Sequence, residues 1–373
     1  MLSAADIRSR VRARLRGSEE DSFTRMPDLR GVTGVIAWRL TVSNFQTDLA
    51  FFDVSKAIWP RRYVGLLAWK RTWFVHVDPD GSAPHFTRTD ALLDPPGEYI
   101  GPFQTGRSAQ KFISTLEDMF DLCREVRCLR LAAESAIAGI LDTAGAPRCS
   151  YGQMGRCVCV CDGTMPMPQY RKLIRDALAF AQGDRQPLAE SLRAGMRQAA
   201  DSLQFERAGA LKAKLDRMAE FDRPEYSYVR NARDLGYLLL QASGSRRRLM
   251  AFYARPDHVT KLDDLAFPLQ PSEMDKLLDR LAAQTPPDRS SSAQPSHDDA
   301  VALAYRMGLV AHYLFAPAAK QGVIIPLPPG PPDCQQLSAQ IAEQIALNLA
   351  PLHLSAPADR HPKESSPGES APV

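Results

Sequence analysis

The cysteines carry the strongest chemical signal in this sequence, because six of the seven lie within residues 123–161. Seven residues separate Cys149 from Cys157, and three separate Cys157 from Cys161. A loop followed by a tight turn could direct these three thiolates at one point, with Cys123 or Cys128 as a fourth ligand. Thiolates converge in this way on zinc or on an iron–sulfur cluster, since the soft ion offsets the repulsion between sulfurs. Buried free thiols are the alternative, and disulfides are a weaker one because they require an oxidising compartment.

Charge and composition limit the class of protein. The formal net charge is only +3, but arginine occupies every second position from Arg8 to Arg16, and a later basic run covers residues 246–248. Such patches can contact phosphates without reading a base sequence. No stretch approaches the ~20 apolar residues of a membrane span, and no secretory segment is recognised, so we expect a cytoplasmic protein.

Hydrophobic periodicity predicts an α+β protein. The first part of the chain is expected to form a basic helix over residues 3–16, a strand over 32–40 and a strand pair over 65–77. A loop over residues 97–103 then leads into a helix that starts near Ser108.

The second half is expected to be more helical. Apolar residues at helical spacing predict two antiparallel helices between residues 188 and 218. Beyond them, apolar runs at 237–240 and 249–253 predict a β-hairpin in a small α/β module. The remainder is expected to comprise a linker at 284–297, helices at 298–315 and 335–349, and a disordered tail at 353–373.

Three stretches follow one another in the order known from one protein family. The first is Gly-Glu-Tyr-Ile-Gly-Pro-Phe at residues 97–103. The second is Cys-Ser-Tyr-Gly-Gln-Met-Gly-Arg-Cys at 149–157, followed by Cys161 and preceded by Phe-Asp-Leu-Cys-Arg at 120–124. The third is Met-Arg-Gln-Ala-Ala-Asp-Ser-Leu-Gln-Phe-Glu-Arg-Ala at 196–208. On these motifs the chain resembles the UvrC family, the nuclease component of the bacterial UvrABC excinuclease, and in particular its divergent members.

The resemblance implies a cofactor and two partners. It implies a 4Fe–4S cluster, with zinc as the alternative, held by Cys123, Cys149, Cys157 and Cys161. The third stretch is similar to the UVR motif, a helical hairpin by which family members meet UvrB, and DNA is the further expected partner. The residues implied to contact UvrB are Met196, Leu203, Phe205, Glu206 and Ala208.

In the resembled family, an N-terminal GIY-YIG nuclease domain incises DNA. Residues 4–11 resemble the helix after the second tyrosine motif, which makes Arg10 the counterpart of the catalytic arginine, in vestigial form. The two tyrosine strands are not found in this sequence. The metal-binding glutamate aligns with Phe51, and only a two-residue shift brings Asp53 into register. Residues 237–253 occupy the place of the family's second, ribonuclease H-like nuclease but carry no acid, so the nuclease apparatus is expected to be incomplete.

These considerations predict a domain order and leave three functions open. The first is a UvrC-like component of nucleotide excision DNA repair, within the SOS response, that docks on UvrB near damaged DNA. The second is a zinc-stabilised UVR-type adaptor without DNA chemistry, and the third is an active GIY-YIG endonuclease truncated by a misplaced start.

The expected domains are a degenerate GIY-YIG-like domain at 1–115, a cysteine-rich region at 116–165, a helical region with the UVR hairpin at 166–222, an α/β module at 223–283, a linker at 284–297, a helical segment at 298–352 and a tail at 353–373.

Overall fold

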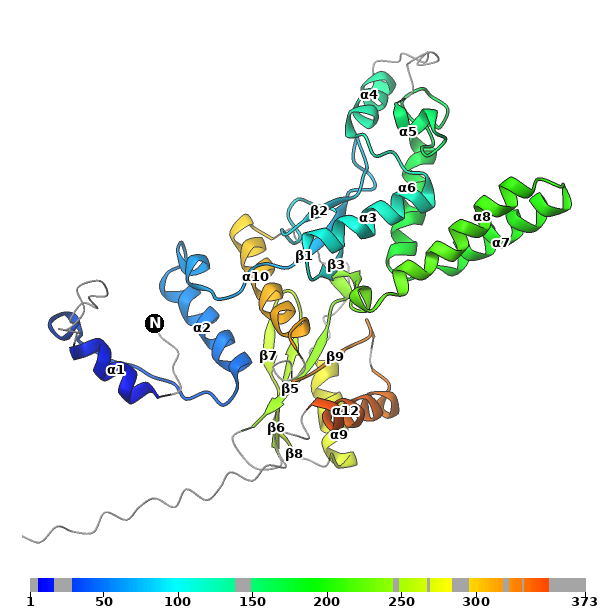
Figure 1. Ribbon diagram of the computed structural model, residues 1–373. Helices are drawn as coiled ribbons and strands as arrows, with labels where there is room; N and C mark the ends of the chain where they lie inside the picture. The colour runs from blue at the N-terminus through cyan, green and yellow to red at the C-terminus, as the bar shows by residue number, and fades with distance from the viewer. Residues whose placement is uncertain are drawn as a thin grey trace, which may run out of the picture.

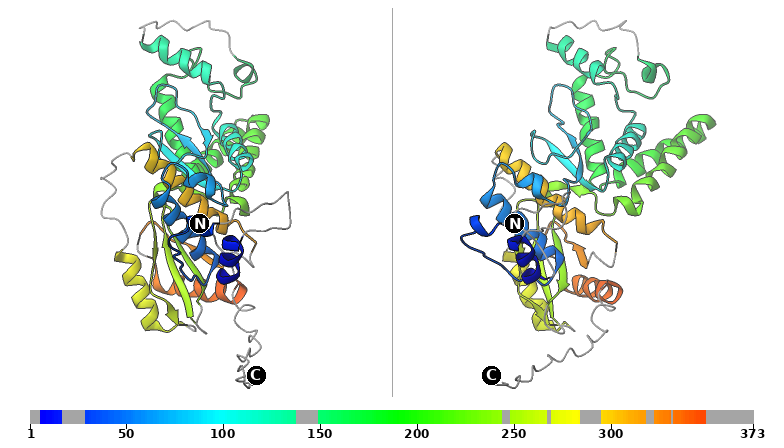
Figure 2. Two further views of the ribbon diagram at one scale, coloured as in Figure 1. Left: turned by 90° about the vertical axis from the view of Figure 1, so that its left-hand side faces the viewer. Right: turned by 60° about the vertical axis from the view of Figure 1, so that its left-hand side comes forward.

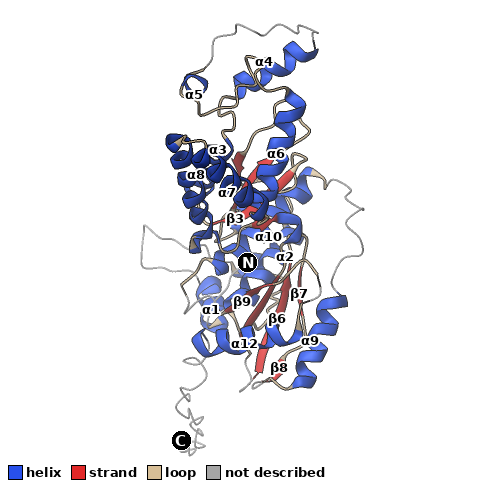
Figure 3. Cartoon of the chain, turned by 90° about the vertical axis from the view of Figure 1, so that its right-hand side faces the viewer, coloured by secondary structure: helices blue, strands red, loops and turns tan. Residues whose placement is uncertain are grey.

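A computed structural model describes most of the chain and has the mixed α and β character expected of an α+β protein. The strands of the described residues form two separate antiparallel sheets, each accompanied by helices (Figures 1 and 3). In sequence, the two sheets are linked through a helical region, which extends from the upper part of the molecule in Figure 1. The described residues are 6–16, 29–137, 149–243, 248–266, 269–283, 295–317, 322–330 and 332–348.

The first sheet is built mainly from residues 73–103. Its strand order is β2-β1-β3-β4, with every neighbouring pair antiparallel. Val75 of β1 lies opposite Arg88 on one side and Ile100 on the other. The strands are β1 (Trp73–Val77), β2 (Thr87–Thr89), β3 (Glu98–Phe103) and β4 (Arg230–Asn231).

The predicted loop at residues 97–103 is wrong, because most of it forms β3, which lies in the middle of the sheet. The helix after it, α3 (Gly106–Phe120), begins two residues earlier than predicted. Thr105 caps this helix through a reciprocal pair of hydrogen bonds with Ser108, which satisfies backbone donors that a helix start leaves unpaired. The apolar side of α3 packs with β1, β3 and α6 (Met167–Ala181) in one core.

The second sheet has the order β7-β6-β5-β9, with β8 paired to β6. The predicted β-hairpin is confirmed by the pairing of β5 with β6, while its turn at residues 244–247 lies outside the described residues. The pairing of β9 with β5 was not predicted. The strands are β5 (Tyr237–Ala242), β6 (Arg248–Ala254), β7 (Val259–Lys261), β8 (Leu265–Ala266) and β9 (Val323–Pro326).

Both faces of this sheet are covered, which explains why β5 is apolar at successive positions. Leu239 and Phe252 face α2 (Asn44–Ile58) and α10 (His297–Leu314) in one core. Leu238 and Leu240 face the opposite core, with α9 (Pro271–Ala283) and α12 (Cys334–Asn348). The predicted helices at 298–315 and 335–349 are thus confirmed to within one residue at each described end. The two views of Figure 2 show these helices around the lower sheet.

The N-terminal part departs most from expectation. The predicted strand at residues 32–40 is wrong, because these residues form no strand pairing and are exposed. Of the predicted strand pair at 65–77, only β1 is a strand. Residues from the predicted 1–115 domain contribute to two cores, since Phe45 and Phe52 of α2 pack with α10, whereas α3 packs on the first sheet.

The remaining elements are short or belong to the site described below. They are α1 (Ile7–Arg16), α4 (Val126–Ile137), α5 (Ser150–Gln153), α7 (Gln186–Asp201), α8 (Phe205–Arg217) and the 3-10 helices η1 (Arg30–Val32), η2 (Tyr63–Leu66), η3 (Met218–Asp222), η4 (Pro224–Tyr226) and η5 (Ala232–Asp234). None of the helices in the described ranges is both long and apolar enough to cross a membrane.

Candidate functional site

The end of α3 positions the first cysteine. Asp121 ends the helix in a left-handed conformation (φ 50°) and turns the chain so that Cys123 is buried. The backbone N–H of Cys123 donates to the hydroxyl of Tyr170 on α6 at 3.2 Å. The loop with the later cysteines returns to the same place, because the N–H of Val158 donates to the carbonyl oxygen of Asp121 at 3.0 Å. The predicted cysteine region is therefore gathered around the C-terminal end of α3.

Arg124 links α3 to the segment that follows Cys149. Its guanidinium pairs with Asp118, lies 3.7 Å from the carboxylate of Glu117, and stacks over the Tyr151 ring at 4.8 Å. Burial raises the pKa of Glu117 to about 7, although Arg124 acts in the opposite direction. An arginine in this position holds the two cysteine-bearing segments together.

The thiols influence one another in two groups. Interaction with the Cys123 side chain lowers the pKa of Cys157 to about 6, while the Cys123 thiol donates to the carbonyl oxygen of Glu125 at 3.4 Å. The N–H of Cys159 lies 3.4 Å from the sulfur of Cys157 and favours the thiolate further. Burial is the main cause that raises the pKa of Cys128 to about 12, and the neighbouring thiols of Cys161 and Cys149 act in the same direction.

These cysteine sulfurs are chemically suited to bind a soft metal ion. The region provides up to five neighbouring sulfurs, of which Cys123, Cys157 and Cys161 are buried and Cys128 and Cys149 are half-buried. They do not converge on a single point, because in the described residues no group of three or more histidine, cysteine or acidic side chains is arranged to hold a metal ion. The sequence offered no means of separating Cys123 from Cys128; in the structure Cys157 has the strongest influence on Cys123, whereas Cys161 and Cys149 act on Cys128.

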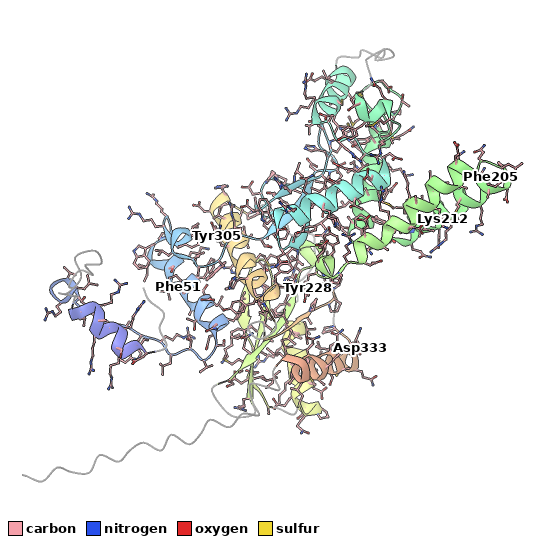
Figure 4. All side chains as sticks on the ribbon, viewed as in Figure 1. Phe51, Phe205, Lys212, Tyr228, Tyr305 and Asp333 are labelled. Carbon is pink, nitrogen blue, oxygen red and sulfur yellow. The ribbon has the colours of Figure 1, made fainter. Side chains whose placement is uncertain are left out.

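The helices α7 and α8 form an antiparallel hairpin that extends away from the body (Figures 1 and 2). Its base is fixed next to the cysteine region, because Lys214 lies 2.6 Å from the carboxylate of Asp121 and Arg217 lies 3.5 Å from that of Asp118. Its free end carries Phe205, which is 68% exposed (Figure 4). No residue of α8 is buried, so most of this helix is uncovered.

The other residues implied to bind the partner lie on α7, on α8 and in the turn between them. Leu203 is 74% exposed and Glu206 is exposed, whereas Met196 and Ala208 are half-buried. Leu203 adopts a left-handed backbone (φ 59°) at the end of α7. The N–H of Leu203 donates to Ala200 and that of Gln204 to Ala199, the hydrogen-bond pattern of a Schellman motif, in which glycine normally takes the left-handed position.

The residues considered for nuclease chemistry lie on α1 and α2. Arg10 is exposed on α1 and lines an open hollow that Phe51 also lines. Asp53 lies on α2 near Arg306, and loss of surrounding water raises the pKa of Asp53. Figure 4 labels Phe51, the position at which the family's glutamate was expected.

The second module has no acidic cluster on its strands. His258 contacts Asp257 at 3.1 Å, whereas Asp263 pairs with Arg280 at 3.2 Å and Asp264 with Lys261 at 3.0 Å. Each acid therefore has its own surface partner. β5 and β6 contain no aspartate or glutamate.

The cysteine region and the first sheet correspond to a known domain. Residues 73–180 match the family model described as "UvrC/Cho excinuclease, middle domain". This match begins at β1 and ends within α6, so it covers the structure around the cysteines and ends just before the hairpin.

The curated proteins that the chain resembles over longer stretches are UvrABC system protein C of several bacteria. The chain is 26% identical over 255 residues to the UvrABC system protein C of Desulforudis audaxviator, covering 68% of this chain and 38% of that protein. It is 23% identical to the same protein of Nitrobacter winogradskyi (66% of this chain, 34% of that protein) and 22% identical to that of Moorella thermoacetica (70% and 40%). The chain thus spans less than half the length of these relatives. No solved structure matches it. The chain is a divergent relative of the UvrC family.

Proposed function

We propose that this protein acts in nucleotide excision repair as a UvrC-like component that docks on a UvrB-type partner through the α7–α8 hairpin. The observation that carries the proposal is the free end of the hairpin, where Leu203 and Phe205 expose 74% and 68% of their surface. Large apolar side chains at the tip of a projecting hairpin are poorly covered by the chain itself. They are suited to enter a groove on a partner, as a helix-borne anchor does.

Backbone strain at Leu203 supports the same proposal. A left-handed conformation costs a residue with a Cβ about 1 kcal/mol or more, and glycine avoids this cost. A leucine in this place is unfavourable for the folded monomer, both in its backbone and in its exposure to water. If Leu203 is buried against a partner, the free energy gained on binding offsets this cost.

The test is Leu203→Gly, with binding and stability measured on the same protein. The strain disappears, so the melting temperature should stay level or rise, because glycine adopts positive φ freely. Affinity for the UvrB protein of the same genome should fall at least tenfold in calorimetric titration. Full affinity in the glycine variant, or no binding of UvrB by the unmodified chain, would exclude the docking role.

We propose in addition that the cysteine region holds an iron–sulfur cluster, with zinc as the alternative. The candidate ligands are Cys123, Cys149, Cys157 and Cys161, and Cys128 is the substitute for one of them, because Cys161 and Cys149 are close enough to raise its pKa. Bound metal would lock the segments that Arg124 already links, since the free energy of ligation adds to that of folding. Anaerobic purification followed by iron, zinc and sulfide analysis tests this, and protein without either metal excludes it.

The proposed role of the protein near DNA is binding without incision. The arginines of α1 are suited to phosphate contacts. Phe51 stands where the family's metal-binding glutamate is expected, which supports a non-cleaving role. Binding of a lesion-bearing duplex should weaken steeply with salt and on joint replacement of Arg10, Arg12 and Arg14 by glutamate. An adaptor without DNA contacts would give no binding in either protein.

A further inference from the structure

Asp121 contacts both the hairpin and the cysteine region. Its carboxylate accepts a hydrogen bond from the ammonium group of Lys214 on α8 at 2.6 Å, and its carbonyl oxygen accepts one from the N–H of Val158 at 3.0 Å. Its left-handed backbone (φ 50°) ends α3 and turns the chain towards Cys123. A displacement of this one residue therefore affects α8 and both segments that carry the buried cysteines.

Asp118 makes a second connection of the same kind, about one turn earlier on α3. Its carboxylate pairs with Arg124, which stacks over the ring of Tyr151 at 4.8 Å, and it lies 3.5 Å from the guanidinium of Arg217. Arg124 and Tyr151 belong to the two cysteine-bearing segments, whereas Arg217 is the last residue of α8. The three charged side chains expose only 16–38% of their surface, so salt screens them less than it screens a pair on the open surface.

Apolar packing joins the same two regions. Cys123 and Cys157 share one core with Leu192 of α7, and Leu211 and Leu215 of α8 pack against it. Protein interiors are close-packed and transmit displacements, so the base of the hairpin and the cysteine region cannot shift independently. The free end of the hairpin, where the partner contacts are proposed, extends away from this core (Figure 1).

We propose that the acidic end of α3, through Asp118 and Asp121, couples the hairpin to the cysteine region, so that ordering one of them stabilises the other. Coupling between two sites is reciprocal. Docking of a partner on the hairpin therefore protects the cysteine region, and a fixed cysteine region strengthens docking by the same factor. The statement about docking rests on the function proposed above, whereas the coupling between the two regions does not.

The test changes the hairpin and measures the cysteine region of the full chain. Lys214→Met removes the ammonium group but keeps an unbranched side chain for the packing of α8. A buried thiol reacts only when the structure around it opens. Alkylation of Cys157 by iodoacetamide, followed by mass spectrometry, should therefore become about fivefold faster in this variant, at the low end of measured couplings between sites.

Two variants serve as controls. Lys214→Arg keeps the positive charge and should keep the slow rate of the unmodified chain. Lys212 is exposed on the same helix, two residues before Lys214 (Figure 4). Lys212→Met should leave the alkylation of Cys157 unchanged. Equal rates in Lys214→Met and the unmodified chain, or equal acceleration in either control variant, would overturn the coupling.

UvrB of the same genome supplies the second arm of the test. Saturating UvrB should slow the alkylation of Cys157 in the unmodified chain, and should slow it less in Lys214→Met. Binding of UvrB that leaves this rate unchanged in the unmodified chain would also overturn the coupling. If the unmodified chain does not bind UvrB, the docking proposal fails, whereas the comparison of the lysine variants still decides the coupling.

Discussion

Replacing Phe205 by alanine should weaken partner binding far more than it destabilises the protein. A phenylalanine side chain covers roughly 200 Å² when it is wholly buried. Because Phe205 is 68% exposed, about 140 Å² remains for a partner to cover, equivalent to about 3.5 kcal/mol at ~25 cal/mol per Å². The affinity for UvrB should therefore fall about 300-fold. The part of the Phe205 side chain that is already buried in the free protein contributes only about 1.5 kcal/mol to folding stability at the same value per Å².

Phe221 provides the matched control. It is 2% exposed, and its ring lies 5.0 Å from those of Phe112 and Phe180 in the core at the base of the hairpin. Phe221→Ala should cost about 3–5 kcal/mol of stability and leave the affinity of the folded fraction unchanged. Titration calorimetry gives the affinities and denaturant unfolding gives the stabilities. If Phe205→Ala binds UvrB as the unmodified chain does, or loses stability as Phe221→Ala does, the reasoning from exposure is refuted.

Three further predictions concern the cysteine region and the nuclease residues. The pKa of Glu117 is raised from 4.5 to about 7 by burial, so the folded state holds the proton more tightly and stability should fall as pH rises through this window. Glu117→Gln should flatten this decline, by up to about 3 kcal/mol at pH 8, and an unchanged pH profile of unfolding contradicts it. Iron content should be lost in Cys149→Ala but retained in Cys159→Ser, because the Cys159 thiol donates to the carbonyl oxygen of Cys157 at 3.3 Å; equal loss in both contradicts the ligand assignment. The chain should not nick a lesion-bearing duplex with any divalent ion, and nicking that Arg10→Ala or Asp53→Ala abolishes would disprove this.

Local patterns were sufficient to locate several elements correctly. The β-hairpin of β5 and β6, the helices α10 and α12, and the pair α7 and α8 follow from hydrophobic period and turn residues, which act over short distances along the chain. The spacing of the cysteines likewise indicated a common neighbourhood for their thiols. The motifs at residues 97–103, 149–157 and 196–208 were sufficient to identify the family resemblance.

Sequence could not determine which partner each element finds. Residues 32–40 have strand-forming side chains, yet the structure leaves them unpaired, because a strand exists only where a second strand accepts its hydrogen bonds. Residues 98–103 look like a loop, with Gly101 and Pro102 weakening the pattern, but the flanking strands β1 and β4 hold them in a sheet. The same limit applies to β9, whose pairing with β5 spans more than 80 residues.

For the candidate site, too, the sequence predicted some features and the structure was needed for others. The residue pattern was enough to predict that cysteines cluster and that a helical hairpin follows them. The tertiary structure was needed to pair Cys123 with Cys157 as its main neighbour and Cys128 with Cys161 and Cys149, and to show that Phe205 lies exposed at the free end of the hairpin. Periodicity records which side of a helix is apolar, whereas exposure depends on what packs against it, and that is fixed by contacts between residues far apart in the chain.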